Sequence, residues 1–82
     1  PSRPPSDAGR VYFGAWIELA DEDDARRKYR IVGADEADVS RGYISVDSPV
    51  ARALLGKSSG DVANVQLPGG ATELELIRVW YA

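Results

Sequence analysis

Cysteine and histidine are both absent from this 82-residue chain. Without cysteine the chain has no disulfide and no thiolate metal site. Without histidine it lacks the commonest general base of enzymes and the commonest metal ligand of proteins. These two absences weigh against an enzyme, and we expect no catalytic residue, no metal site and no cofactor.

Basic charge and long apolar runs are also scarce. Ten Lys and Arg residues stand against 13 Asp and Glu residues, a formal net charge of −3, whereas a dedicated nucleic-acid-binding domain is usually basic. No apolar run approaches the ~20 residues of a membrane span, and no signal-peptide pattern opens the chain. We therefore expect a cytoplasmic protein that contacts neither nucleic acid nor membrane directly.

The first nine residues differ in composition from the rest. Residues 1–9 hold three prolines and almost nothing apolar, as linkers between domains do. Position 1 is Pro rather than Met, so we interpret the sequence as an excised piece. Residues 10–82 then form one domain with room for one modest core, and we expect a monomer.

The clearest local signals lie in residues 44–57. Ser48 precedes Pro49, which pushes the Ser48 backbone into the extended region where an N-cap hydroxyl can accept a first-turn amide. Pro49 then falls at the first helical position, and Gly56 suits a left-handed C-terminal cap. The pattern predicts a helix of about two turns, which is too short to be stable alone. It must lie on a sheet through its apolar residues, which are Val50, Ala51, Leu54 and Leu55.

Alternating apolar and polar residues predict strands in the rest of the domain. The predicted strands cover residues 10–19, 26–33, 43–46, 62–67 and 72–80. A charged turn at residues 21–24 joins the first two as an antiparallel hairpin, and a Pro-Gly-Gly turn at residues 68–70 joins the last two. A loop, with at most one helical turn, fills residues 35–42. The fold class is then α+β: an antiparallel sheet of four longer strands and one short strand, packed on one short helix.

Two of these strands carry finer signals. In residues 10–19, Gly14 indicates a bulge or a close neighbouring backbone. The predicted core face of that strand consists of Val11, Phe13, Ala15, Ile17 and Leu19. In residues 72–80 the apolar phase shifts after Leu76, which indicates a bulge or burial on both faces. A helix over residues 72–79 is the alternative, but the β-branched and aromatic tail and the preceding turn favour a strand.

Charged clusters could carry chemistry, and each has a plainer structural explanation. The carboxylates of residues 21–24 could hold Mg²⁺ or Ca²⁺, but a solvated hairpin turn is the usual meaning of such a run. The Arg-Arg-Lys run at residues 26–28 could contact phosphate, but beside an acidic turn it favours surface ion pairs. Asp35, Glu36 and Asp38 could form an acid–base site, but nothing indicates the burial that would raise a carboxyl pKa.

The remaining candidates are a hydroxyl, a loop and a set of aromatic residues. Ser48 has no His, and no clearly placed Lys, to activate it as a nucleophile, so the N-cap interpretation is favoured. Residues 68–70 open no helix and lack the spacing of a phosphate loop, so a turn is favoured. Four aromatic residues could stack nucleic-acid bases, but we expect them to be divided between the core and the sheet face. These four are Tyr12, Trp16, Tyr43 and Trp80.

Most of the domain resembles one family. The chain is similar to the C-terminal domain of the Gre-type bacterial transcript-cleavage factors, GreA and GreB, over nearly everything after the linker. The central motif, residues 43–57, is long and specific, and the Phe-Gly-Ala-Trp stretch at residues 13–16 leans toward GreB. The matching segments are residues 11–16, 29–33, 43–57, 60–61 and 67–70.

The resemblance implies an FKBP-like fold, in which a curled antiparallel sheet cradles a short helix. It also implies that the domain anchors its factor on the rim of the RNA polymerase secondary channel, on a coiled coil of the largest subunit. In the family, an N-terminal coiled coil enters that channel, and acidic residues at its tip help hold the second Mg²⁺ for hydrolysis of backtracked RNA. The polymerase itself is the catalyst. That coiled coil would precede residue 1, so residues 21–24 are not its acidic tip.

The resemblance carries the docking role to Asp47, Ser48 and Pro49. Ala51 and Arg52 are added because they neighbour those residues on the helix. We expect these five residues to bind polymerase, with no chemistry performed by the domain itself. One alternative is a Gre-homologous regulator, Rnk-like or inhibitory, that competes for the same rim. Another is an FKBP-type isomerase or ligand-binding domain, which we disfavour because fold alone does not confer function.

Overall fold

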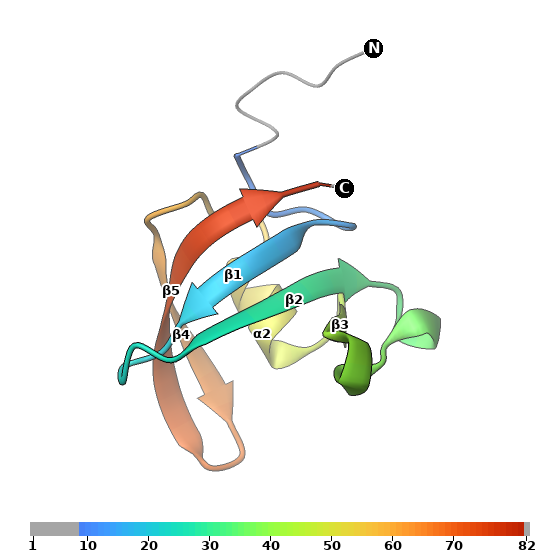
Figure 1. Cartoon of the computed structure of the whole chain (residues 1–82). Coiled ribbons are helices and arrows are strands. Elements are labelled where there is room, and N and C mark those ends of the chain that lie inside the picture. Colours follow the sequence, from blue (N-terminus) through green and yellow to red (C-terminus); the bar gives the residue numbers. More distant parts are fainter. Residues whose placement is uncertain (1–8, 82) are drawn as a thin grey trace.

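A five-stranded sheet curls around one short helix in the computed structural model, which describes residues 9–81 (Figure 1). The strands lie side by side in the order β3-β2-β1-β5-β4. Helix α2 covers the concave face of the sheet, and short 3₁₀ helices η1 and η2 lie between β2 and β3. The elements are β1 (Trp16–Ala20), β2 (Arg26–Val32), η1 (Ala34–Glu36), η2 (Val39–Arg41), β3 (Tyr43–Ser45), α2 (Pro49–Leu54), β4 (Val62–Leu67) and β5 (Gly70–Trp80). The predicted linker lies outside the described residues, apart from Gly9.

The α+β class and the helix cradled by a curled sheet are confirmed, and so are the two predicted hairpins. Strand β1 pairs antiparallel with β2 and with β5, and β4 pairs antiparallel with β5. The pairing of β3 with β2 is parallel, so the sheet is mixed rather than wholly antiparallel. The reason is the connection through residues 33–42. It carries η1 and η2 back along β2, so that Tyr43 starts β3 opposite Arg30 and runs in the same direction.

The predicted strand at residues 10–19 is shorter than expected. Val11 instead pairs with the segment after the helix: its N–H donates to the Lys57 carbonyl at 3.0 Å, and its carbonyl accepts from the Gly56 N–H at 2.8 Å. A tight turn follows, closed by a 3.0 Å bond from Ala15 N–H to the Tyr12 carbonyl, with Gly14 at a φ of 88°. Such a positive φ is typical of the third residue of a type II turn.

This turn corrects one core assignment. Val11, Ala15, Ile17 and Leu19 are buried as predicted, but the Phe13 side chain is 58% exposed. Alternation through residues 10–19 assumed an unbroken strand, and the turn at Gly14 interrupts it. Phe13 therefore points away from the core instead of sharing the face of Ile17.

The phase shift in the last strand marks a bulge, as predicted. Glu18 lies opposite Arg78, whereas Leu19 lies opposite Leu76, so Ile77 is the extra residue on β5. The bulge lets Leu76 and Val79 both face the core: Leu76 is fully buried and Val79 packs against the same cluster.

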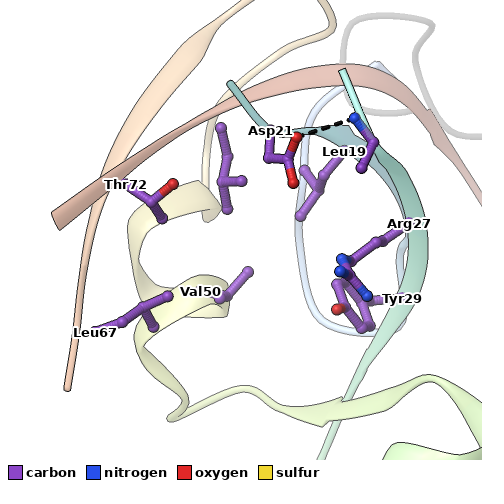
Figure 2. A pocket seen from close by; sticks show the side chains of 9 residues that line it. Leu19, Asp21, Arg27, Tyr29, Val50, Leu67 and Thr72 are labelled. Atoms are coloured by element: carbon purple, nitrogen blue, oxygen red, sulfur yellow. Dashed lines mark hydrogen bonds between the residues drawn. The ribbon is translucent and has the colours of Figure 1, made fainter. Parts of the chain in front are cut away.

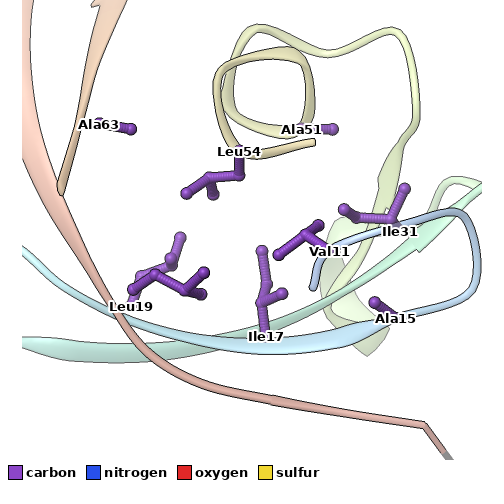
Figure 3. Close-up of a cluster of buried hydrophobic side chains, with 9 residues drawn as sticks. Val11, Ala15, Ile17, Leu19, Ile31, Ala51, Leu54 and Ala63 are labelled. Atoms are coloured by element: carbon purple, nitrogen blue, oxygen red, sulfur yellow. The ribbon is translucent and has the colours of Figure 1, made fainter. Parts of the chain in front are cut away.

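The core fills the space between α2 and the concave face. Figure 3 shows Leu54 pointing from the helix toward Ile17 and Leu19 on β1, with Val11 and Ile31 beside them. Leu54, Ile17 and Ile31 are each fully buried. Burial of a side chain of this size contributes roughly 1.5–3 kcal/mol, which anchors a helix too short to persist alone.

Candidate docking surface

The start of α2 is fixed by its own residues. Ser48 has the extended backbone of an N-cap, with φ −68° and ψ 155°, and its Oγ accepts from the Ala51 N–H at 3.3 Å. Its carbonyl accepts the first helical bond from the Arg52 N–H at 2.9 Å, and Pro49 occupies the first turn. At the other end Gly56 has a φ of 83°, the left-handed geometry predicted for it. The capping predictions are confirmed.

The chain just before the helix is held equally firmly. The Asp47 N–H donates to Ser45 Oγ at 3.0 Å, and the Ser48 N–H donates to the Ser45 carbonyl at 2.9 Å. These bonds engage the backbone of Asp47 and leave its carboxylate at the surface. Within residues 9–81 that carboxylate forms no ion pair and no hydrogen bond. It is a fixed anionic group available to a partner.

Four of the five predicted site residues share this surface. Asp47, Pro49 and Arg52 are exposed, and Ser48 is half-buried because its hydroxyl serves the cap. Ala51 is fully buried in the core cluster. Helical spacing explains the difference, because the residue before Arg52 faces the sheet. The Ala51 side chain therefore supports the helix from below and does not reach a partner.

A cavity of about 220 Å³ adjoins the same end of α2. Figure 2 shows Val50 from the helix and Leu67 from β4 on one side, with Arg27 and Tyr29 of β2 on the other. The interior is mainly apolar, and Arg27 and Asp21 supply polar groups. Its lining residues are Leu19, Asp21, Ala25, Arg27, Tyr29, Val50, Leu67, Thr72 and Leu74. Val50 lies in the first turn of α2, next to Pro49, so this turn lines part of the cavity, although none of the five predicted site residues lines it.

Sequence reasoning missed this cavity because no local pattern encodes it. The sequence pattern places ordinary core residues at three of its lining positions, Leu19, Val50 and Leu74. The gap between them arises because the β4–β5 hairpin curls away from α2 beyond the point where Leu54 and Leu76 fill the core. The one sequence feature that could have indicated an apolar site here was Val50, an apolar residue directly beside the predicted docking residues.

Several members of the charged clusters have structural roles. Asp21 Oδ1 accepts from the N–H groups of Asp23 and Ala25, each at 2.9 Å, and so shapes the β1–β2 turn. Nowhere in the described part of the chain do three or more acidic side chains come together as a metal site. Asp38 caps η2 by accepting from the Ser40 N–H at 3.1 Å. Arg26 lies 3.6 Å from Glu18 and 3.5 Å from Asp24, as the surface interpretation predicted.

The fold and its surface define a small α+β domain that presents a capped helix and an apolar cavity side by side. The family model "Transcription elongation factor, GreA/GreB, C-term" matches residues 5–81, and the chain belongs to this family. Among the helices at residues 9–81, none is long and apolar enough to cross a membrane.

Curated relatives carry both names of the family. The chain is 52% identical to the transcription elongation factor GreA of Alkalilimnicola ehrlichii, over 90% of this chain and 48% of that protein. It is 49% identical to GreB of Haemophilus ducreyi, over 94% of this chain and 48% of that protein. The chain therefore spans about half the length of these relatives.

Solved structures share the fold. The Gfh1 protein (GreA factor homolog 1) of Thermus thermophilus matches with a TM-score of 0.76 at 29% identity, over 94% of this chain and 52% of that one. A GreA/GreB elongation factor from Nitrosomonas europaea also matches with a TM-score of 0.76, at 25% identity over 99% of this chain and 70% of that one.

Proposed function

We propose that this domain docks a transcription elongation factor onto RNA polymerase, on the secondary-channel rim of the largest subunit. The observation that carries the proposal is a fixed helix cap flanked by exposed charges, with an apolar cavity that the first turn of the same helix lines through Val50. The relatives that share about half of their aligned residues with this chain are named as transcription elongation factors, which supports a partner within the transcription machinery.

The cavity suits an apolar side chain of a protein partner. Its volume of about 220 Å³ is below the roughly 300–1,000 Å³ of typical small-molecule sites. Leu19, Val50 and Leu74 offer apolar contact, and an inserted side chain would gain about 25 cal/mol for each Å² of apolar surface removed from water. A buried apolar anchor surrounded by polar contacts is the usual composition of a tight protein interface.

The helix start supplies the polar contacts. Asp47 offers an exposed carboxylate just before the N-cap, and Arg52 offers an exposed guanidinium five residues later, within the helix. Charged groups at the rim of an interface mainly set orientation and the rate of association. Pro49 keeps the backbone between them rigid, so little conformational entropy is lost on binding.

In this proposal the domain positions its parent protein and performs no chemistry. Hydrolysis of backtracked RNA belongs to the polymerase, assisted by a segment outside this sequence. The domain then works as a cytoplasmic monomer. It needs no cofactor, because docking requires only a complementary shape, apolar contact and a few charged groups.

A titration of the ¹⁵N-labelled domain with the isolated rim coiled coil of the polymerase tests the proposal. We expect shifts at Asp47, Pro49-flanking amides and Arg52, together with the cavity residues. The double variant Asp47→Ala/Pro49→Ala should bind about tenfold more weakly, because it removes an orienting charge and the proline that keeps the backbone rigid. Glu73→Ala removes an exposed carboxylate from the opposite sheet face and serves as the control. If the double variant binds as well as the parent, the site is wrong.

A further inference from the structure

The convex face of the sheet, turned away from α2, carries a row of aromatic and arginine side chains. In register across four strands lie Tyr43 of β3, Arg30 of β2, Trp16 of β1 and Trp80 of β5. Side chains of residues in register share a face, and the neighbours Ile17 and Ile31 point to the core. Arg78 lies two residues before Trp80 on the same face. We call these five residues the outer row.

Contacts within the outer row are specific. The rings of Trp16 and Trp80 stack with centroids 6.1 Å apart at 11°, and Tyr43 meets Trp16 edge-on at 6.0 Å. The Arg78 guanidinium lies 4.1 Å from the Trp80 centroid, and that of Arg30 lies 6.0 Å from Trp16. Arg30 Nε also donates to the Gly14 carbonyl at 3.2 Å. Both guanidinium groups are therefore held in place before any partner arrives.

Positive charge collects around this row although the whole chain is acidic. Lys28 lies on the same face of β2 as Arg30, two residues away. Within the structure described, none of the Lys28, Arg30 and Arg78 side chains forms an ion pair. Glu18 lies in register between Lys28 and Arg78, but its carboxylate is paired with Arg26 at 3.6 Å. Glu73 and Glu75 lie on the same face farther along β5, so the excess of cations is confined to the part of the face around Lys28, Arg30 and Arg78.

We propose that the outer row is a second docking surface, and that its partner is a protein surface rich in carboxylates. The proposal rests on the proposed function, because it assigns that surface to RNA polymerase outside the rim coiled coil. Trp, Tyr and Arg are the residue types that dominate binding energy at protein interfaces. A guanidinium stacked on an aromatic ring keeps its N–H edge free for a carboxylate and loses little entropy in binding it.

The ring contacts favour a protein over a nucleic acid. Sequence reasoning expected Trp16, Trp80 and Tyr43 to be divided between core and surface, and the structure instead brings them together on one face. Binding of single-stranded nucleic acid draws its affinity from bases stacked on free ring faces. Here the stacked rings of Trp16 and Trp80 lie 6.1 Å apart between centroids, and the Arg78 guanidinium lies 4.1 Å from the Trp80 centroid, so part of these ring faces is already occupied. The edges of the rings and of the guanidinium groups remain available to a partner, and they suit a protein that carries carboxylates.

A comparison of two binding partners distinguishes docking by the outer row from docking by the helix cap. The affinity of the domain is measured for core RNA polymerase and, separately, for the isolated rim coiled coil. We expect Lys28→Ala/Arg78→Ala to weaken binding to the core enzyme about tenfold and to leave binding to the coiled coil unchanged. Raising the salt concentration should also weaken binding of the parent to the core enzyme more steeply than that of the double variant.

Matched variants control for charge and folding. Arg78→Ala is compared with Arg41→Ala, because Arg41 is an exposed guanidinium of η2, 3.5 Å from Asp38 and outside the outer row. Only Arg78→Ala should weaken binding to the core enzyme. Thermal unfolding of both variants checks that the fold is kept, and Arg78→Lys should recover part of the affinity by restoring the charge.

Three results would overturn the inference. The first is equal affinity of the double variant and the parent for the core enzyme. The second is an equal loss for the core enzyme and the coiled coil, which would place Lys28 and Arg78 in the first site. The third is binding of a labelled single-stranded RNA that the double variant abolishes, which would make the partner a nucleic acid. Failure of the parent to bind either partner would instead refute the proposed function.

Discussion

Gly14 and Gly69 both occupy turns, but their backbones make different demands. Gly14 has a φ of 88°, whereas Gly69 has no positive φ, and an added Cβ would meet no atom within 4 Å at either position. The space around an added Cβ therefore does not distinguish the two positions, whereas the backbone φ angle does. Left-handed backbone brings the Cβ of an L-residue too close to the following carbonyl.

Substitution of each glycine by alanine isolates this conformational term. We expect Gly14→Ala to lower the free energy of unfolding by about 1–2 kcal/mol, and Gly69→Ala to change it little or raise it by up to about 1 kcal/mol. Chemical denaturation of both variants measures the difference. Equal effects at the two positions would show that the turn at Gly14 adopts another conformation.

Single residues also show where sequence reasoning succeeds. Ser48, Pro49 and Gly56 were placed correctly because capping depends on the nearest few residues. Phe13 was misjudged, and Ala51 was correctly placed on the apolar side of the helix but does not suit the docking set, because the exposure of a side chain depends on what packs against it. Adjacency on the helix grouped Ala51 with Arg52, and alternation grouped Phe13 with Ile17, but neither rule includes the packing partner.

Among the elements, α2 depends strongly on its termini, because Pro49–Leu54 is shorter than two turns. Its N-cap hydroxyl satisfies an amide that would otherwise be unpaired beneath the proposed docking surface. The core side chain Leu54 fixes its position against β1. Loss of the cap should therefore loosen the element that carries Asp47 and Arg52.

Replacement of the cap hydroxyl tests this dependence. We expect Ser48→Ala to reduce the free energy of unfolding by about 0.5–2 kcal/mol. Ser59→Ala is the control, because Ser59 is exposed and its hydroxyl forms no hydrogen bond within residues 9–81. Urea denaturation followed by tryptophan fluorescence gives both values. A Ser48 variant as stable as the Ser59 variant would mean that the hydroxyl contributes nothing.

The sequence was sufficient to predict where the strands lie, but it did not predict every pairing between strands. The β4–β5 and β1–β2 hairpins followed from the turns between them. The parallel pairing of β3 with β2 depends on the path of residues 33–42, where two single-turn 3₁₀ helices replace the expected loop. Such a path is decided by contacts distant in sequence, and no local signal marks its direction.

At the scale of the whole molecule, the two faces of the sheet carry the two proposed docking surfaces. The concave face holds the core and, at one end, the cavity beside α2. The convex face holds the outer row, on the other side of the same strands. Docking through both faces at once would fix the domain between two surfaces, so its orientation would be set more firmly than one contact allows.

Filling the cavity should abolish the apolar anchor without disturbing the fold. Thr72 lines the cavity from β5, and we expect Thr72→Phe to weaken binding to the rim coiled coil at least about tenfold by occupying the space. Glu73→Phe adds the same side chain to the opposite face, where it should leave this binding intact. Retained binding by the Thr72 variant, with an unchanged unfolding temperature, would exclude the cavity as the anchor site.

The position of β1 between β2 and β5 has a consequence for synthesis. On the ribosome, β1 and β2 emerge early and can form their hairpin, but the second edge of β1 stays unpaired until β5 is translated. Folding of such distant pairings is slow, since a long loop must close before they form. We therefore expect the nascent domain to expose Ile17 and Leu19 beside an open strand edge, which is the kind of surface that chaperones bind, until its final strand is in place.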